Sequence, residues 1–149
     1  MSIEELPSKY LMHKIKCKRS PNTVKRTAFS ICYYMKYMAE KEMELTEVYQ
    51  LDYEKQTEHF VEFLYWLKAG NHTEQTAGEK KCPNEGTCNA YLKDVFRFYL
   101  FIEAEYEQYG SLKTLSYNQI IAVNQVGVKK VLRNHSFKAY LKEEEHRGR

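Results

Sequence analysis

The chain has 149 residues, of which 43% are hydrophobic and 14% aromatic, and its formal net charge at pH 7 is +3. This length suits one domain with a real core, and the content of core-forming residues excludes a disordered tail. No apolar run approaches the roughly 20 residues of a membrane span, and the N-terminus has no apolar signal-peptide segment. We therefore expect a cytoplasmic, mostly helical protein with reduced cysteines, no metal site and no cofactor.

Residues 1–19 are expected to form a mobile arm or a short helix that leads into a basic segment. From Lys9 to Arg26 the chain carries seven Lys or Arg residues and no acidic residue. The block 40–62 has the opposite character, with eight acidic residues against two Lys. Basic charge confined to one part of the chain indicates the basic face that a DNA-binding surface needs. Ordinary scatter of solvated charge is the alternative interpretation.

Ser20 is predicted to cap a helix that runs to about Lys41, with Pro21 at the first position, where its missing N–H costs nothing. Apolar residues recur in steps of four and three and predict one buried face, made of Val24, Ala28, Ile31, Met35 and Met38. Cys32 is placed on this apolar face. Small polar side chains, free backbone N–H groups and positive charge thus converge at one helix start, as in sites that hold a phosphate.

Five more segments are predicted along the chain. A second helix is predicted over about 54–69, with Phe60, Phe63, Leu64 and Leu67 as its apolar stripe, and a long loop over 70–86. Thr87 is predicted to cap a third helix that ends before Gly110. A weaker helix over about 117–122 and a short element over 126–133 complete the expected elements.

On the third helix, Asn89, Lys93 and Arg97 recur in steps of four and are predicted to share one exposed face. In a major groove, Arg or Lys can bond guanine and Asn can bond adenine, so this face is predicted to contact DNA. A solvated polar stripe opposite the apolar face is the alternative.

Two segments together resemble the tyrosine recombinases, and more narrowly the N-terminal core-binding domain of phage and transposon integrases. The first is Ser-Pro-Asn-Thr-Val-Lys-Arg at 20–26, and the second is Asn-Glu-Gly-Thr-Cys-Asn-Ala-Tyr-Leu-Lys-Asp-Val-Phe-Arg-Phe-Tyr-Leu-Phe-Ile-Glu at 84–103. The resemblance spans about 16–147. It implies an all-α, SAM-like bundle of four to five helices over 20–135, with 136–149 as a linker toward a catalytic domain.

The resemblance also implies a function. Such a domain packs on one side of double-stranded DNA, opposite the catalytic domain of the same parent chain, and clamps the crossover site during DNA integration and recombination. Further recombinase protomers on the DNA are expected partners, a membrane is not, and a bacterial, phage or transposon origin is implied. The catalytic Arg, Lys, His or Trp and nucleophilic Tyr residues are expected in the other domain, so this chain is predicted not to be an enzyme.

The predicted DNA contacts are cations and small polar residues from both segments, with further cations near the C-terminus: Lys16, Lys18, Arg19, Ser20, Asn22, Thr23, Lys25, Arg26, Thr87, Asn89, Lys93, Arg97, Lys129, Lys130 and Arg147. Asn22 and Thr23 serve equally well as capping residues only. The rival hypothesis is a helical protein-interaction module that binds an acidic partner through the same basic face. A stand-alone enzyme has no supporting set of residues.

Overall fold

The computed structural model describes residues 5–73, 82–116, 119–123 and 127–132. These residues form five α-helices, two short 3₁₀ helices and one antiparallel pair of strands. In chain order the elements are α1 (Leu6–Lys16), α2 (Pro21–Glu40), η2 (Leu45–Gln50), α3 (Tyr53–Lys68), α4 (Glu85–Glu105), η3 (Glu107–Tyr109), α5 (Lys113–Ser116), β1 (Gln119–Val123) and β2 (Val128–Leu132). The predicted all-α bundle of four to five helices is thus confirmed in the described residues, with one hairpin added.

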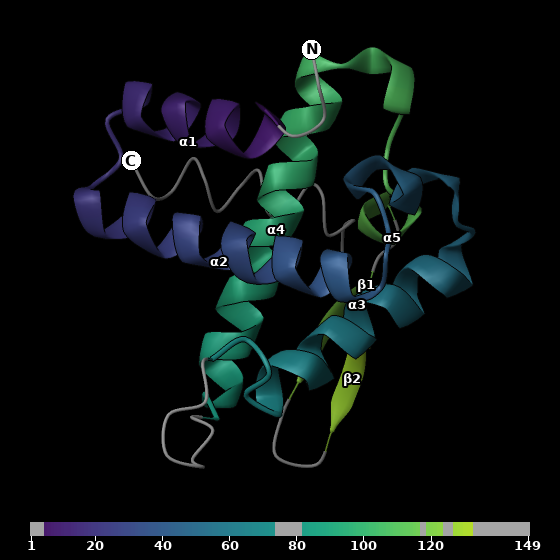
Figure 1. Ribbon diagram of the computed structural model, residues 1–149. Helices are drawn as coiled ribbons and strands as arrows, with labels where there is room; N and C mark the ends of the chain where they lie inside the picture. Colours follow the sequence, from purple (N-terminus) through teal and green to yellow (C-terminus); the bar gives the residue numbers. More distant parts are fainter. Residues whose placement is uncertain (1–4, 74–81, 117–118, 124–126, 133–149) are drawn as a thin grey trace.

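Helix α4 is the central element, and the other long helices pack around it (Figure 1). Helices α1 and α2 lie side by side and both contact α4, while α3 packs against α4 and α2. Strand β1 contacts α3 and α4. Leu6 and Tyr10 of α1 belong to the hydrophobic core. Of the two alternatives for the N-terminal segment, residues 6–16 therefore form a packed helix.

Side-chain caps start the two helices that carry the family resemblance. The Ser20 hydroxyl accepts a hydrogen bond from the Thr23 backbone N–H at 3.2 Å, which confirms the predicted cap of α2. The Asn84 side chain accepts from the Thr87 backbone N–H at 2.8 Å, so Asn84 caps α4. The prediction that Thr87 is the cap was wrong, because Asn is an equally strong cap and starts the helix one turn earlier, at Glu85.

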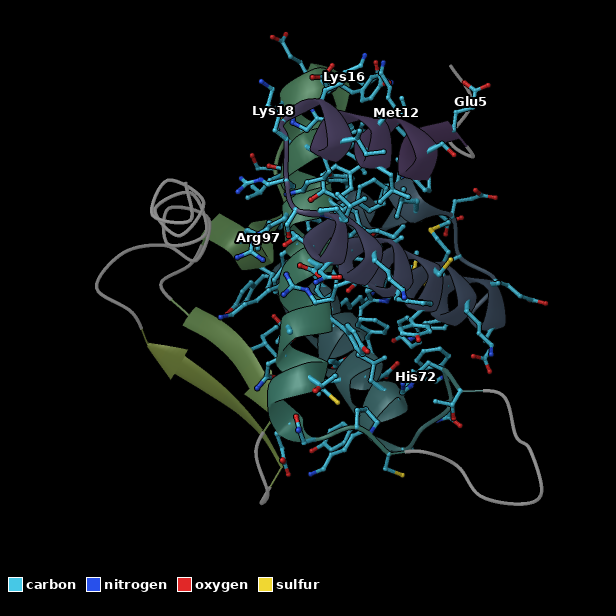
Figure 2. The ribbon with its side chains drawn as sticks, turned by 90° about the vertical axis from the view of Figure 1, so that its left-hand side faces the viewer. Glu5, Met12, Lys16, Lys18, His72 and Arg97 are labelled. Atoms are coloured by element: carbon cyan, nitrogen blue, oxygen red, sulfur yellow. The ribbon has the colours of Figure 1, made fainter. Side chains whose placement is uncertain are left out.

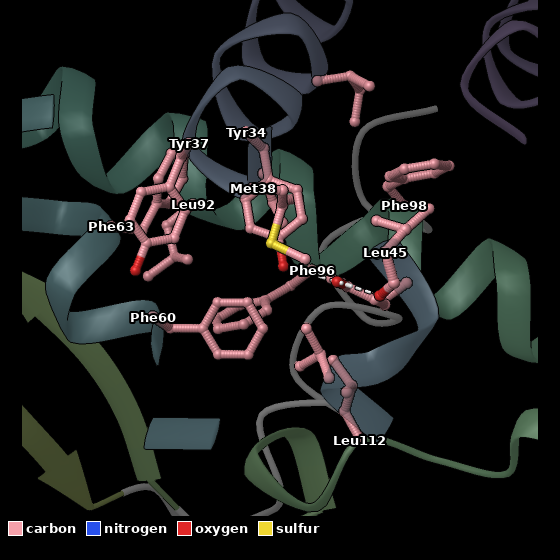
Figure 3. Close-up of a cluster of buried hydrophobic side chains, with 14 of the residues drawn as sticks. Tyr34, Tyr37, Met38, Leu45, Phe60, Phe63, Leu92, Phe96, Phe98 and Leu112 are labelled. Carbon is pink, nitrogen blue, oxygen red and sulfur yellow. Dashed lines mark hydrogen bonds between the residues drawn. The ribbon is translucent and has the colours of Figure 1, made fainter. Parts of the chain in front are cut away.

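The core is rich in aromatic side chains from α2, α3 and α4 (Figure 3). The predicted apolar stripe of α3 is confirmed, since its four members are all fully buried: Phe60, Phe63, Leu64 and Leu67. The rings of Phe60 and Phe96 meet edge to face with centroids 4.8 Å apart, and so join α3 to α4. Each such ring stabilises the fold by about 2 to 3 kcal/mol through burial alone.

The buried face of α2 differs from the predicted one. Ile31 and Met38 are buried as predicted, but the other predicted members are only half-buried: Val24, Ala28 and Met35. Their places are taken by Thr27, Ser30, Tyr34 and Tyr37, and Cys32 is exposed. The prediction used only apolar residues and so missed this face. Burial of Tyr and Ser side chains is favourable once their hydroxyls are hydrogen-bonded.

The chain after α5 forms a hairpin where a helix was predicted. The predicted helix 117–122 overlaps strand β1, which pairs antiparallel with β2 so that Gln119 is opposite Leu132 and Val123 is opposite Val128. Strand-favouring β-branched residues make up three of the five residues of β1 and two of the five of β2. Gly127 precedes β2 with a φ of +151°, a conformation that other residues rarely adopt.

A chain of hydrogen bonds crosses the aromatic core from η2 to α3. The Tyr99 hydroxyl donates to the Leu45 carbonyl oxygen at 2.9 Å, so its oxygen accepts the proton of the Tyr34 hydroxyl at 2.6 Å. Tyr34 has then used its only proton, and its oxygen accepts from His59 Nε2–H at 2.9 Å. His59 is therefore the neutral Nε2–H tautomer. Its buried Nδ1 has no hydrogen-bond partner among the described residues.

This arrangement opposes protonation of His59, because the second proton would sit on Nδ1 in a dry core. Burial, with the charge of Lys41 as a smaller cause, lowers the pKa of His59 from 6.5 to about 4. In the unfolded chain the imidazole keeps its ordinary pKa, so the unfolded state takes up the proton first as the pH falls. The contribution of neutral His59 to stability is complete above pH 6.5 and is lost as the pH falls toward 4.

We expect the free energy of unfolding to fall by about 2 kcal/mol between pH 7 and pH 5 through this residue. Urea titrations at a series of pH values would measure the loss. A His59→Gln variant removes the titrating group and should show a correspondingly flatter profile over the same interval. Equal losses in the two proteins would rule out His59 as the source.

Candidate nucleic-acid interface

A surface hollow of about 410 Å³ lies where the second turn of α2 meets the first half of α4. It is lined by Arg26 from α2 and by five residues of α4: Gly86, Asn89, Ala90, Lys93 and Arg97. The structure thus brings together four predicted site residues from two segments far apart in the sequence. Gly86 and Ala90 have no bulky side chains, which leaves the space between the cations open.

The prediction that Asn89, Lys93 and Arg97 share one face of α4 is confirmed, since all three line this hollow. The face is less exposed than predicted. All three residues are half-buried, and the Arg97 side chain is only 16% exposed. The cause is α2, which crosses α4 at this point and covers part of the stripe.

Behind the hollow lies Asp94, whose carboxylate is 2% exposed and accepts four hydrogen bonds. Arg26 donates to both oxygens, from Nε to Oδ2 at 3.1 Å and from Nη2 to Oδ1 at 3.2 Å. Ser30 Oγ donates to Oδ2 at 2.7 Å, and Arg97 Nη1 donates to Oδ1 at 3.4 Å. A buried carboxylate needs such partners, because an unpaired carboxylate would lose its hydration and gain no hydrogen bonds in exchange.

The Asp94 carboxylate has two consequences for the hollow. It joins α2 to α4 through the two-pronged pair with Arg26, the geometry in which Arg–carboxylate pairs are strongest. It also offsets one of the three positive charges contributed by Arg26, Lys93 and Arg97. The hollow therefore remains cationic, with two of its cations held in fixed positions. Such a site can hold an anion.

Sequence reasoning missed Asp94 and Ser30 as members of this site. The sequence did contain a signal for Asp94. The segment 91–102 is apolar except for Lys93, Asp94 and Arg97, and Asp94 is its one acidic residue. A lone carboxylate on the buried side of a helix requires cationic or hydroxyl partners. Which residue supplies them depends on how the helices cross, and no pattern along the chain contains that information.

The predicted contacts at the start of α2 divide into two groups. Ser20 and Thr23 serve the cap, with their hydroxyl oxygens 2.8 Å apart, in addition to the backbone hydrogen bond that Ser20 accepts. Asn22 and Lys25 are exposed. Because Arg26 follows Lys25 directly, exposed positive charge continues from the start of α2 to the hollow.

Figure 2 labels Lys16 of α1, Lys18 of the connection to α2 and Arg97 of α4, and shows Lys18 and Arg97 on the same side of the view. Lys18 adopts a left-handed conformation with a φ of +57°, which ends α1 and turns the chain into α2. Lys16 lines a separate hollow of about 220 Å³ beside α1, together with Lys9, Met12, His13, Phe101 and Glu105. Lys16 and Lys18 are exposed and Arg19 is half-buried.

Four predicted contacts remain, at Thr87, Lys129, Lys130 and Arg147. Thr87 is half-buried in the first turn of α4, where its backbone N–H is used by the cap. Lys129 and Lys130 lie in β2, opposite Ala122 and Ile121 of β1. Arg147 and the predicted linker 136–149 lie outside the described residues. Within the part of the chain that is described, no group of three or more His, Cys, Asp or Glu residues is placed to hold a metal ion.

We expect Arg26→Gln to lower the free energy of unfolding by about 2 kcal/mol, because buried Asp94 would lose its two-pronged partner. Lys25→Gln removes the same charge from an exposed neighbour and should change stability by less than about 0.5 kcal/mol. Urea unfolding at pH 7 measures both. In an Asp94→Asn background the cost of Arg26→Gln should be smaller, and an equal cost in both backgrounds would contradict the assignment.

No family model matches the chain, and no curated protein or solved structure matches it either. Among the described residues, no helix is both long enough and apolar enough to cross a membrane. Function therefore has to be inferred from the sequence and from the geometry of the site.

Proposed function

We propose that this chain is a DNA-binding domain that contacts double-stranded DNA through α2 and the first half of α4. The observation that carries the proposal is the cationic hollow, in which Arg26, Lys93 and Arg97 converge from two helices beside an Asn side chain. Exposed Lys25 extends the positive surface along α2. Lys and Arg side chains gathered on one face are the electrostatic footprint of a protein that neutralises backbone phosphates.

The resemblance in the sequence gives this proposal its specific form. The hollow is built from the two segments that resemble the core-binding domain of tyrosine recombinases, 20–26 and 84–103. The proposed role is that of a clamp, which holds the crossover site while a catalytic domain of the same parent chain breaks and rejoins the strands. In this role the chain supplies binding and positioning, and it supplies no nucleophile.

One observation favours a second candidate, a module that binds an acidic protein segment. Phe29 is 46% exposed on α2, about one turn beyond Arg26, and its ring stacks on Tyr33 with centroids 6.1 Å apart. An exposed aromatic ring beside a cationic hollow suits a peptide that carries both acidic and apolar side chains. The two candidates use the same surface and differ in their dependence on salt.

We expect the protein to bind fluorescently labelled duplexes of about three helical turns, with an affinity that falls steeply as salt rises. A Lys25→Gln, Lys93→Gln double variant should lower the log–log salt slope by about 1.8, since each phosphate contact contributes about 0.9. Lys55→Gln is the matched control, because Lys55 is an exposed lysine in the first turn of α3, at the other end of the molecule from the start of α2 (Figure 1). Fluorescence anisotropy measures all three proteins.

The same titration separates the two candidates. Binding to a labelled peptide of alternating Glu and Leu at salt concentrations that abolish binding to every duplex would favour the protein-interaction module. A control variant that loses as much DNA affinity as the double variant would show that the effect reflects total charge and not this surface.

A further inference from the structure

The charged side chains that line the hollow, Arg26, Lys93 and Arg97, are those that bind a phosphate group. We propose that the hollow receives a single backbone phosphate of a DNA strand, and that Asp94 is a positioning residue for the arginines that hold it. This inference rests on the proposed function and makes it more specific. The sequence predicted that α4 contacts DNA and allowed contacts to base edges in a major groove. A phosphate contact fixes the position of the duplex and reads no sequence.

The burial of Arg97 favours a phosphate over a base edge as its ligand. A side chain that reads a base must project from the protein into the groove of the duplex. Arg97 is withdrawn instead, with 16% of its side chain exposed and its guanidinium held 3.4 Å from the carboxylate of Asp94. A phosphate group projects from the rim of the duplex and can enter a concave site that a base edge, at the floor of a groove, does not reach.

The charges of the hollow also fit this ligand. Among the described residues, every charged side chain that lines the hollow is a cation, and a phosphodiester group carries one negative charge. Gly86 and Ala90 lie on the first two turns of α4, near the end of the helix where the backbone dipole is positive. The dipole acts only within the first turn, where Glu85 also lies, so the three side-chain cations are the main attraction for an anion here.

The carboxylate of Asp94 is what makes the site rigid. It fixes the Nε and Nη2 atoms of Arg26 and one nitrogen of Arg97, so neither guanidinium has to be immobilised when a phosphate enters. Pre-positioned donors bind more tightly than mobile ones because the entropy of ordering is already lost. Asp94 thus contributes to phosphate binding, although its own charge does not attract an anion.

The first test fills the hollow without changing its charge. Ala90→Leu places a larger side chain in the lining, and Ala104→Leu makes the same change at an exposed position near the end of α4. We expect Ala90→Leu to weaken binding on the order of tenfold for each of three duplexes of unrelated sequence, and Ala104→Leu to leave it unchanged. Equal binding by the two variants would overturn the proposal, as would a loss confined to one duplex, which indicates base readout.

Lys93→Gln gives an independent measurement at the same site. We expect it to lower the log–log salt slope by about 0.9 and to weaken binding by the same factor on all three duplexes. An unchanged slope would contradict a phosphate contact. If the wild-type protein binds none of the duplexes, the proposed function itself fails, and this inference fails with it.

The direction in which Asp94→Asn changes the affinity for DNA tests the positioning role. Removing a negative charge beside a DNA surface should tighten binding if charge alone matters, whereas loss of positioning should weaken it, on the order of tenfold. Circular dichroism melts establish a temperature at which the variant is fully folded, and anisotropy is then measured below it. Binding that is unchanged or tighter would overturn the positioning role, and rescue by Asp94→Glu would support it.

Discussion

One buried carboxylate fixes how α2 and α4 cross at the candidate site, and the cationic hollow depends on that crossing. Asp94 satisfies its oxygens entirely with donors from Arg26, Ser30 and Arg97, so burial leaves none of its charge unpaired. A hydrophobic contact would tolerate sliding of one helix along the other. A two-pronged pair does not, because both of its hydrogen bonds require the guanidinium and the carboxylate to remain coplanar and in register.

The interior follows the same principle a few turns farther along α2. The hydroxyls of Tyr34 and Tyr99 hydrogen-bond to each other, and the chain continues to His59 on one side and Leu45 on the other. Aromatic rings supply a large part of the buried core, and the directional hydrogen bonds of their hydroxyls select one packing arrangement. Side chains that a hydropathy pattern counts as polar thus define the core as much as the phenylalanines do.

The sequence predicted most of what local physical chemistry determines. The start of α2 at Ser20, the buried stripe of α3 and the shared face of Asn89, Lys93 and Arg97 could all be read from caps and spacing. The rotated face of α2 could not, because a Tyr or Ser is buried only where a partner from another helix meets its hydroxyl. The hairpin was taken for a helix because so short an apolar segment has no clear period. Asp94 was missed because its role depends on the contact between two helices.

The positive charge of this surface can be increased at only some of its positions. The most direct route to a more basic hollow, loss of Asp94, would also release the crossing of α2 and α4 on which the hollow depends. Charge can be gained without that penalty only at the rim, at exposed positions such as Asn22, which has no part in the carboxylate network. Among close relatives of this chain, substitutions that change the affinity should therefore fall around the hollow. The residues of its floor and Asp94 should change together or not at all.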